Sequence, residues 1–149
     1  MTTLKFFIAF FLFGVSFNST AQNTNEWTQF HSQDGFVFYM KYSECKFNDV
    51  QGQSWALVKL ENTNTYDAEV TFYYETYLDG KCMDCGNYSE EKKKVVSVPA
   101  GATKEGFCKP DARRGPLDVF HKFTLVKARE LTNLKVVNLS FEKIKIKDK

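Results

Sequence analysis

Hydrophobic and polar residues alternate with a period of two along most of this chain, which is the pattern of β-strands with one buried face. Turn-forming pairs such as Asp34-Gly35 and Asp79-Gly80 separate the alternating segments. The segments are residues 35–42, 55–62, 67–78, 92–98, 103–108, 118–127 and 133–147. Beyond the N-terminal apolar run, no segment shows the 3.6-residue period of an amphipathic helix. The sequence therefore predicts an all-β fold, a single antiparallel β-sandwich of about seven strands.

The phase of each segment predicts which side chains face the core. The inward-facing set is Phe36, Phe38, Met40, Ala56, Val58, Leu60, Ala68, Val70, Phe72, Tyr74, Val96, Val98, Val119, His121, Phe123, Leu125, Val137, Leu139 and Phe141. Because His121 is in phase with Phe123 and Leu125, we interpret it as a hydrogen-bonded core histidine rather than a ligand.

The last segment changes phase near its end. Ile144 and Ile146 have the opposite parity to Phe141. A β-bulge near Glu142 and Lys143, or a strand that switches sheets, would restore a common face. The lysines that alternate with these isoleucines are typical of an edge strand protected against pairing with other chains.

The N-terminus has the composition of a secretory signal peptide, predicted at residues 1–21. One lysine precedes ten apolar residues (6–15), and a mostly small and polar stretch follows. The apolar run is too short to span a membrane. Ser19 and Ala21 fit the −3 and −1 positions of a cleavage site. We expect one mature domain, residues 22–149, exported to the periplasm or the extracellular space, with no membrane span after cleavage.

Charge and side-chain chemistry narrow the range of functions. The formal net charge is +2 over 149 residues, which gives no electrostatic case for nucleic acid. The chain has two histidines, and no Ser-His-Asp arrangement is suggested by their order or context. We therefore predict no nucleic-acid partner, no cofactor, no catalytic residues and no enzymatic activity.

Parts of the chain resemble the bacterial Ig-like and fibronectin-III-like sandwiches. The resemblance rests on residues 57–64 (LVKLENTN), 68–74 (AEVTFYY) and 96–103 (VSVPAGAT). In such domains a strand ends in an Asn-rich turn, an aromatic strand follows, and a Pro-x-Gly turn separates two later strands. Residues 19–22 (STAQ) are similar to the signal-peptide ends of small exported Bacteroidota-type proteins. The resemblance implies an Ig-like domain in residues 22–149. It carries no catalytic residue, and the central Trp and inter-sheet Cys pair of antibody domains are absent.

The four cysteines, Cys45, Cys82, Cys85 and Cys108, all follow the predicted signal peptide. If successive strands run up and down the sandwich, all four reach the same end. An even number of cysteines in an exported chain favours two disulfides. Because long loops gain more from a cross-link, we favour bridges in which Cys45 and Cys108 each take one thiol of the Cys-x-x-Cys motif. The competing pattern, Cys82 with Cys85 and Cys45 with Cys108, is expected if that motif keeps a redox role.

Two other chemistries fit the same cysteines. Four cysteine ligands would suit zinc, and a nearby methionine would suit Cu(I). A redox Cys-x-x-Cys pair normally opens a helix, whereas this one lies in a polar loop between predicted strands.

Tyr73, Glu75 and Tyr77 form a row on the outward face of their strand and are the best candidates for a recognition surface. The alternative is that a neighbouring loop covers this row. Our first hypothesis is a non-enzymatic exported binding or interaction module of the cell envelope, with a protein or glycan partner. The alternative is a metal-binding (zinc or copper) or thiol-redox protein that uses the four cysteines.

Overall fold

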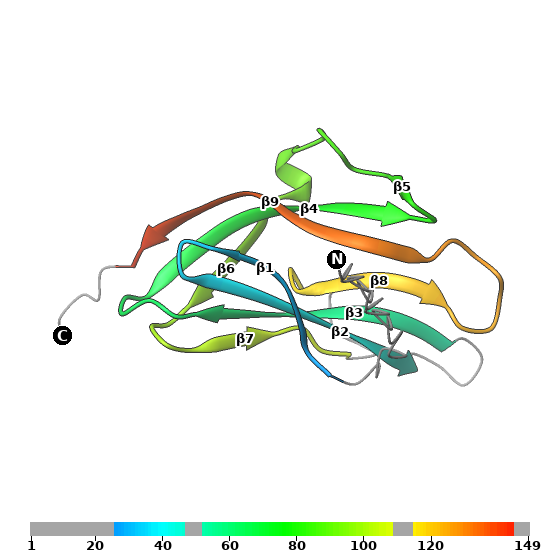
Figure 1. Cartoon of the computed structure of the whole chain (residues 1–149), viewed down its shortest axis with the longest axis horizontal. Coiled ribbons are helices and arrows are strands. Elements are labelled where there is room, and N and C mark those ends of the chain that lie inside the picture. The colour runs from blue at the N-terminus through cyan, green and yellow to red at the C-terminus, as the bar shows by residue number, and fades with distance from the viewer. Residues whose placement is uncertain (1–25, 47–51, 109–114, 145–149) are drawn as a thin grey trace, which may run out of the picture.

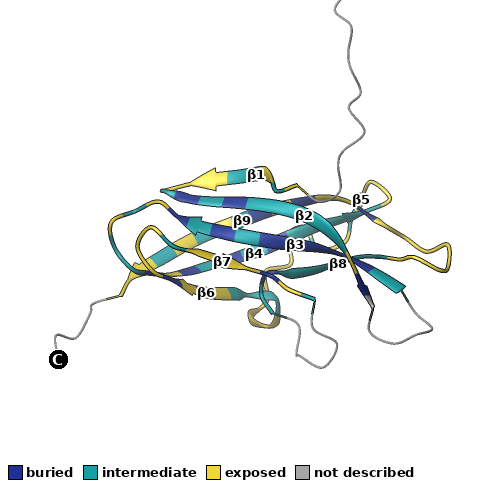
Figure 2. Cartoon of the chain, turned by 90° about the horizontal axis from the view of Figure 1, so that it is seen from below, coloured by how far each residue is buried: buried dark blue, intermediate teal, exposed yellow. Residues whose placement is uncertain are grey.

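The computed structural model describes residues 26–46, 52–108 and 115–144, so the predicted signal peptide lies outside the described residues. In the described part, two antiparallel sheets pack face to face as a β-sandwich (Figures 1 and 2). The predicted all-β sandwich is confirmed, with nine strands rather than about seven. The 3-10 turn η1 (Glu90–Lys92) precedes β6. Within the same residues, no helix is long and apolar enough to cross a membrane.

Each sheet has one long central strand. The first sheet consists of β1 (Thr28–Gln33), β2 (Phe36–Lys46), β3 (Gly52–Asn62), β7 (Thr103–Glu105) and β8 (Asp118–Phe123). Its order is β1-β2-β3, and β7 and β8 pair with successive parts of the remaining edge of β3. The second sheet consists of β4 (Ala68–Leu78), β5 (Lys81–Cys82), β6 (Lys94–Val98) and β9 (Leu131–Lys143). In it β9 follows one edge of β4, while β5 and β6 share the other edge.

The core lies between the sheets and follows the predicted phase over most of its length. Phe36, Phe38 and Phe72 are fully buried. The rings of Phe38 in β2 and Phe72 in β4 meet edge-on across the two sheets, with 5.1 Å between their centroids. The buried residues that confirm the predicted phase of β3, β4 and β6 are Ala56, Val58, Leu60, Ala68, Val70, Tyr74, Val96 and Val98.

Two tight hairpins account for the strands that the sequence did not predict. In both turns the two central residues have positive φ angles, 51° and 80° at Asp34 and Gly35, and 48° and 76° at Asp79 and Gly80. Asp-Gly is the pair that two-residue hairpins with two positive φ angles prefer. The first turn joins β1 to β2, and the second joins β4 to the short β5.

A β-bulge at His121 reverses the phase of β8 relative to the prediction. The register between β3 and β8 shifts at this point. Val119 packs against the core, but Phe120 and Phe123 contact each other, with ring centroids 5.0 Å apart. Phe120 belongs to the cluster on the outer face of the first sheet. Leu125 lies beyond the strand and is 67% exposed. The prediction that Phe123 and Leu125 face inward is therefore wrong, because one extra residue in a strand reverses the faces that follow.

A second bulge, at Asn138, changes the phase of β9. Asn138 has a φ of 51°, and the register with β4 shifts there. The core residues of β9 are Leu131, Leu134 and Val136 before the bulge and Leu139 and Phe141 after it. The phase change thus occurs earlier than the predicted site at Glu142 and Lys143, and Val137 lies outside the core cluster. Ile144 is exposed, and Ile146 is outside the described residues.

Candidate functional site

All four cysteines lie at one end of the sandwich, as predicted. Strand β3 is antiparallel to β2 and connects to β4 at the opposite end, so β2 and β4 run in the same direction (Figure 1). Cys45 lies near the C-terminal end of β2, and Cys82 follows the C-terminal end of β4 through the Asp79-Gly80 turn. Strand β7, antiparallel to β3, leads to Cys108 at the same end.

The cysteines nevertheless form two separate bridges. Cys45 is bonded to Cys108, with Cα atoms 5.5 Å apart, and Cys82 is bonded to Cys85, with Cα atoms 5.8 Å apart. The favoured pairing of Cys45 and Cys108 with the Cys-x-x-Cys motif is therefore wrong, and the competing pattern is the one formed. The four sulfurs do not gather into one four-cysteine metal site either. Among the described residues, the group of potential metal ligands with atoms within 4.8 Å of one another is Glu75, Cys82 and Cys85.

The physical reason for this pairing is that the two bridges lie on opposite outer faces. Cys45 is out of phase with the core residues of β2 and packs with Trp55 and Leu57 on the outer face of the first sheet. Cys82 pairs with Tyr77 across the β4–β5 hairpin, on the outer face of the second sheet. Packed sheets are about 10 Å apart. Thiols on their outer faces cannot approach to the Cα distance that a disulfide requires.

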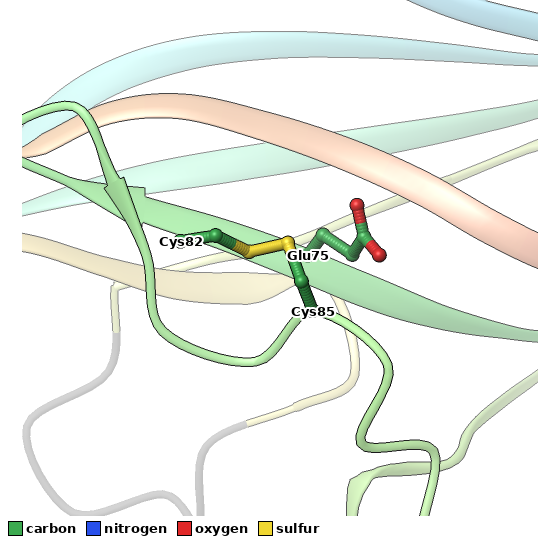
Figure 3. Close-up of side chains that lie close together, drawn as sticks. All are labelled: Glu75, Cys82 and Cys85. Atoms are coloured by element: carbon green, nitrogen blue, oxygen red, sulfur yellow. A yellow bond between two sulfur atoms is a disulfide. The ribbon is translucent and has the colours of Figure 1, made fainter.

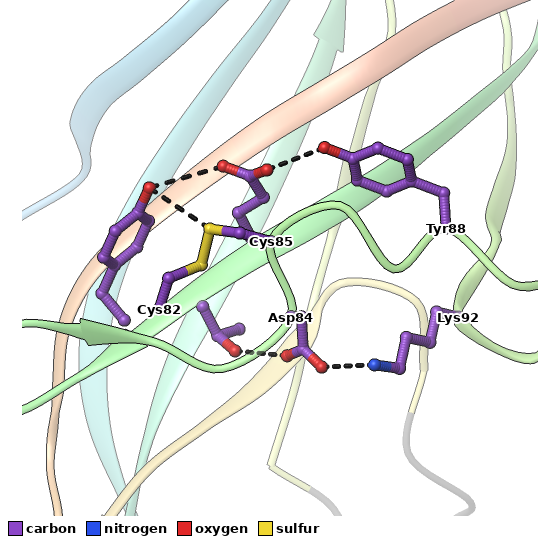
Figure 4. The surroundings of a disulfide bond; sticks show 8 residues. Cys82, Asp84, Cys85, Tyr88 and Lys92 are labelled. Atoms are coloured by element: carbon purple, nitrogen blue, oxygen red, sulfur yellow. Dashed lines mark hydrogen bonds and ion pairs between the residues drawn. A yellow bond between two sulfur atoms is a disulfide. The ribbon is translucent and has the colours of Figure 1, made fainter.

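Glu75 and two tyrosines surround the Cys82–Cys85 bridge (Figures 3 and 4). The Tyr88 hydroxyl donates to Glu75 Oε1 at 2.8 Å. The Tyr77 hydroxyl lies 3.4 Å from Glu75 Oε2 and 3.5 Å from Cys85 Sγ. One carboxylate thus organises the side chains next to the bridge.

Asp84, inside the Cys-x-x-Cys motif, fixes the loop to the rest of the second sheet (Figure 4). Its carboxylate accepts a hydrogen bond of 2.6 Å from Thr76 Oγ1 and forms an ion pair with Lys92. These two interactions, that with Lys92 first, hold the pKa of Asp84 below its usual value. The backbone N–H of Met83 also donates to the Thr76 carbonyl at 2.9 Å. The loop is therefore held by side-chain and backbone contacts as well as by the disulfide.

A lysine from β9 balances part of the charge of Glu75. Lys135 is directly opposite Glu75 in the β4–β9 ladder, and its Nζ lies 5.0 Å from the centre of the Tyr77 ring. The interaction with the Tyr77 hydroxyl raises the pKa of Lys135. The hydrogen bond to Glu75 raises the pKa of Tyr88.

The predicted recognition row lies where expected, and the loop partly covers it. Tyr73, Glu75 and Tyr77 lie on the outer face of β4 and are all half-exposed. The ring of Tyr88, from the loop, lies 5.5 Å from that of Tyr73. The alternation of residues in the sequence predicted neither the contribution of Tyr88 nor the closeness of Glu75 to the cysteine pair.

His121 lies away from this site, in β8 of the first sheet. Its Nδ1 lies 2.9 Å from Ser54 Oγ, and its ring contacts that of Tyr42 in a tilted arrangement, with 4.2 Å between centroids. These residues line a cavity of about 570 Å³. Burial lowers the pKa of His121. Ser54 is itself buried, which favours a structural hydrogen bond over a nucleophile and its base. His121 is thus hydrogen-bonded as predicted, but half-buried rather than in the core.

With this geometry established, the chain was compared with known proteins. No protein-family model matches it, and no match was found among curated proteins or solved structures. The resemblance to Ig-like and fibronectin-III-like domains therefore stays a prediction.

Proposed function

We propose that this protein is a non-enzymatic binding module exported to the cell envelope, where it binds a protein or glycan partner. The binding surface is the group of Tyr73, Glu75, Tyr77 and Tyr88, which we call the β4 face. The observation that carries the proposal is that these side chains form one partly exposed, hydrogen-bonded patch beside a disulfide. Aromatic rings offer a large contact area with few torsions to fix, and the carboxylate adds directional hydrogen bonding.

The side chains of the β4 face need little further ordering when a partner binds. Glu75 is already oriented by two tyrosine hydroxyls, and Asp84 anchors the loop that carries Tyr88. Side chains that are immobilised before binding lose less conformational entropy when a partner arrives. This preorganisation favours a recognition role over a surface that is merely solvated.

The state of the cysteines supports export. All four are oxidised in the structure, and disulfides persist in the periplasm and outside the cell rather than in the reducing cytosol. The predicted signal peptide points to the same compartments. We therefore assign the mature chain to the periplasm or the extracellular space.

The surroundings of the Cys82–Cys85 bridge favour binding over thiol-redox catalysis. Redox cysteines react as thiolates, which positive charge or a helix N-terminus stabilises. Here the motif begins in the short strand β5, and the Glu75 carboxylate beside it opposes negative charge on sulfur. The site therefore lacks the electrostatic support that a dithiol catalyst needs.

We also infer that the sandwich is Ig-like. Strands β2, β3 and β7 are neighbours in one sheet, and β6, β4 and β9 are neighbours in the other. The chain changes sheets after β3, after β6 and after β8. This order corresponds to strands A, B and E facing C and F of an Ig domain.

Site-specific photo-cross-linking tests the binding face. A photoreactive phenylalanine analogue replaces Tyr73 in one variant and Lys104, exposed on β7 of the other sheet, in the control. Both oxidised proteins are irradiated with the envelope fraction of the producing cell. We expect an adduct from the Tyr73 position that excess wild-type protein suppresses, and none from the Lys104 position. Equal adducts from both positions, or none from Tyr73, would contradict the proposal.

A further inference from the structure

We propose that Glu75, Cys82 and Cys85 form a zinc site when the Cys82–Cys85 bridge is reduced. The β4 face would then hold either a disulfide or a divalent metal ion. This inference goes beyond the proposed function, because the β4 face can bind its partner in the oxidised state whether or not the reduced chain binds metal.

The hairpin register brings the three ligands together. Cys82 is opposite Tyr77 in the β4–β5 ladder, and Tyr77 lies two residues beyond Glu75 on the same face of β4. The two sulfurs and a carboxylate oxygen of Glu75 all lie within 4.8 Å of one another (Figure 3). The bond from Met83 N–H to the Thr76 carbonyl and the contacts of Asp84 do not depend on the disulfide. They keep the loop against β4, and hence the thiols beside Glu75, after the bridge opens.

The charge of the reduced site calls for a divalent cation. Two thiolates and a carboxylate carry three negative charges, and Lys135 is the cation opposite Glu75 on the neighbouring strand. Because the ligand atoms lie within 4.8 Å of one another, these like charges repel. A divalent ion bound between them replaces the repulsion with attraction.

The donor set selects zinc among the common metals. Zinc accepts thiolate and carboxylate ligands together in a tetrahedral arrangement, and a site with three protein ligands leaves the fourth position for water or a bound group. Magnesium and calcium require oxygen ligands, and Cu(I) prefers thiolate and thioether ligands without a carboxylate. Met83, the thioether inside the motif, has its sulfur 3.9 Å from the Arg129 guanidinium. Cys85 is exposed, so the fourth position is open to solvent.

The other disulfide cannot contribute ligands. Cys45 and Cys108 are bonded to each other and pack against Trp55 on the outer face of the first sheet. The site therefore has two sulfur ligands and one oxygen ligand, rather than four sulfurs. This difference can be measured from the thiolate-to-metal charge-transfer absorption of a cobalt derivative.

The exchange between the two states balances through a dithiol reductant. The reductant gives two electrons and two protons to the Cys82–Cys85 bond and itself becomes a disulfide. Zinc then displaces the two thiol protons, which pass to the buffer, and coordinates both thiolates together with Glu75. When zinc leaves, the two thiolates take back two protons, and a disulfide oxidant then accepts two electrons and two protons from the thiols and becomes a dithiol, which restores the bridge.

A cobalt titration of the mature chain tests the proposal. The protein is reduced anaerobically with a phosphine, which is removed before Co²⁺ alone is added, and Zn²⁺ is used to displace the cobalt. We expect one Co²⁺ per reduced chain, with absorption from two thiolates, and no binding by the oxidised chain. Glu75→Gln should weaken binding at least tenfold, as loss of a metal-supporting group does. The matched control Glu69→Gln, an exposed carboxylate on the same face of β4, should bind like the wild type.

Several results would overturn the zinc site. Co²⁺ binding by the oxidised chain, or none by the reduced chain, would do so. A cobalt band that persists after Cys82→Ser with Cys85→Ser would assign the metal to Cys45 and Cys108. Near-UV circular dichroism reports whether reduction unfolds the chain. If it does, Glu75→Gln and Glu69→Gln will bind Co²⁺ equally, and that equality also overturns the proposal. The cross-linking test uses oxidised protein, so its outcome is independent.

Discussion

The two disulfides should contribute very differently to stability. We consider two double variants, Cys45→Ala with Cys108→Ala and Cys82→Ala with Cys85→Ala. The bridged residues are 63 positions apart in the first pair and 3 apart in the second. The chain-entropy model gives about 4 kcal/mol for the long loop and about 2 kcal/mol for the short one.

Packing increases this difference. Cys45 is 3% exposed and contacts Trp55 and Leu57, so removing its sulfur leaves a small cavity in the outer cluster. Truncation of this size in a packed site costs about 1 kcal/mol. Cys85 is exposed, and removing its sulfur leaves no comparable cavity. We therefore expect the Cys45/Cys108 variant to lose about 3 kcal/mol more than the Cys82/Cys85 variant.

Urea unfolding under non-reducing conditions measures both losses. The comparison must use the free energy of unfolding extrapolated to zero urea. The Cys45/Cys108 variant lacks the cross-link that closes the long loop, so its unfolded chain exposes more surface and its m-value is larger. Equal losses in the two variants would refute the chain-entropy reasoning. A loss below about 2 kcal/mol for the Cys45/Cys108 variant would argue against that bridge in solution.

Three further predictions test the core, the histidine and the leader. Phe72→Ala should cost about 3–5 kcal/mol of unfolding free energy, because the side chain is fully buried. Tyr73→Ala should cost much less, because Tyr73 is half-exposed. Equal costs in urea unfolding would mean that the phase of β4 is wrong. Burial lowers the pKa of His121 below 6.5, so the unfolded chain takes up the proton first as the pH falls. The wild type should therefore lose stability relative to His121→Gln between pH 7 and pH 5, and a constant difference over this range would contradict the assignment. N-terminal sequencing of the exported protein should begin at Gln22, whereas an intact Met1 form in the membrane fraction would exclude cleavage.

The period of two predicted the core well wherever strands pair without interruption. Phe36 and Phe38 lie in β2, which keeps a constant register with β3, and Phe72 lies in β4, which keeps a constant register with β6. The register with β9 shifts opposite Phe72, but the extra residue lies in β9, so the phase of β4 is unchanged. The predicted phase failed at two of the register shifts, at His121 in β8 and at Asn138 in β9, where one strand has a residue that its partner lacks. Where an extra residue is accommodated depends on the partner strand, which is distant in sequence, so the alternation alone cannot locate it.

The candidate site was only partly predictable. Features set by local strand register could be predicted from the sequence, whereas features set by tertiary contacts could not. The Asp79-Gly80 turn allows one register, in which Tyr77 is opposite Cys82, so the sequence already implied that the Cys-x-x-Cys motif shares a face with Glu75. The odd position of Cys45, out of phase with the core residues of β2, likewise implied that its thiol points outward from the other sheet. Loop entropy favoured bridges from Cys45 and Cys108 to the Cys-x-x-Cys motif. Those cysteines lie on opposite outer faces of the sandwich, so these bridges cannot form whatever their entropic advantage. The hydrogen bond from Tyr88 to Glu75, by contrast, depends on the path of the loop that carries Tyr88. That loop has neither a hydrophobic period nor a strand register, so no local sequence pattern specifies the contact.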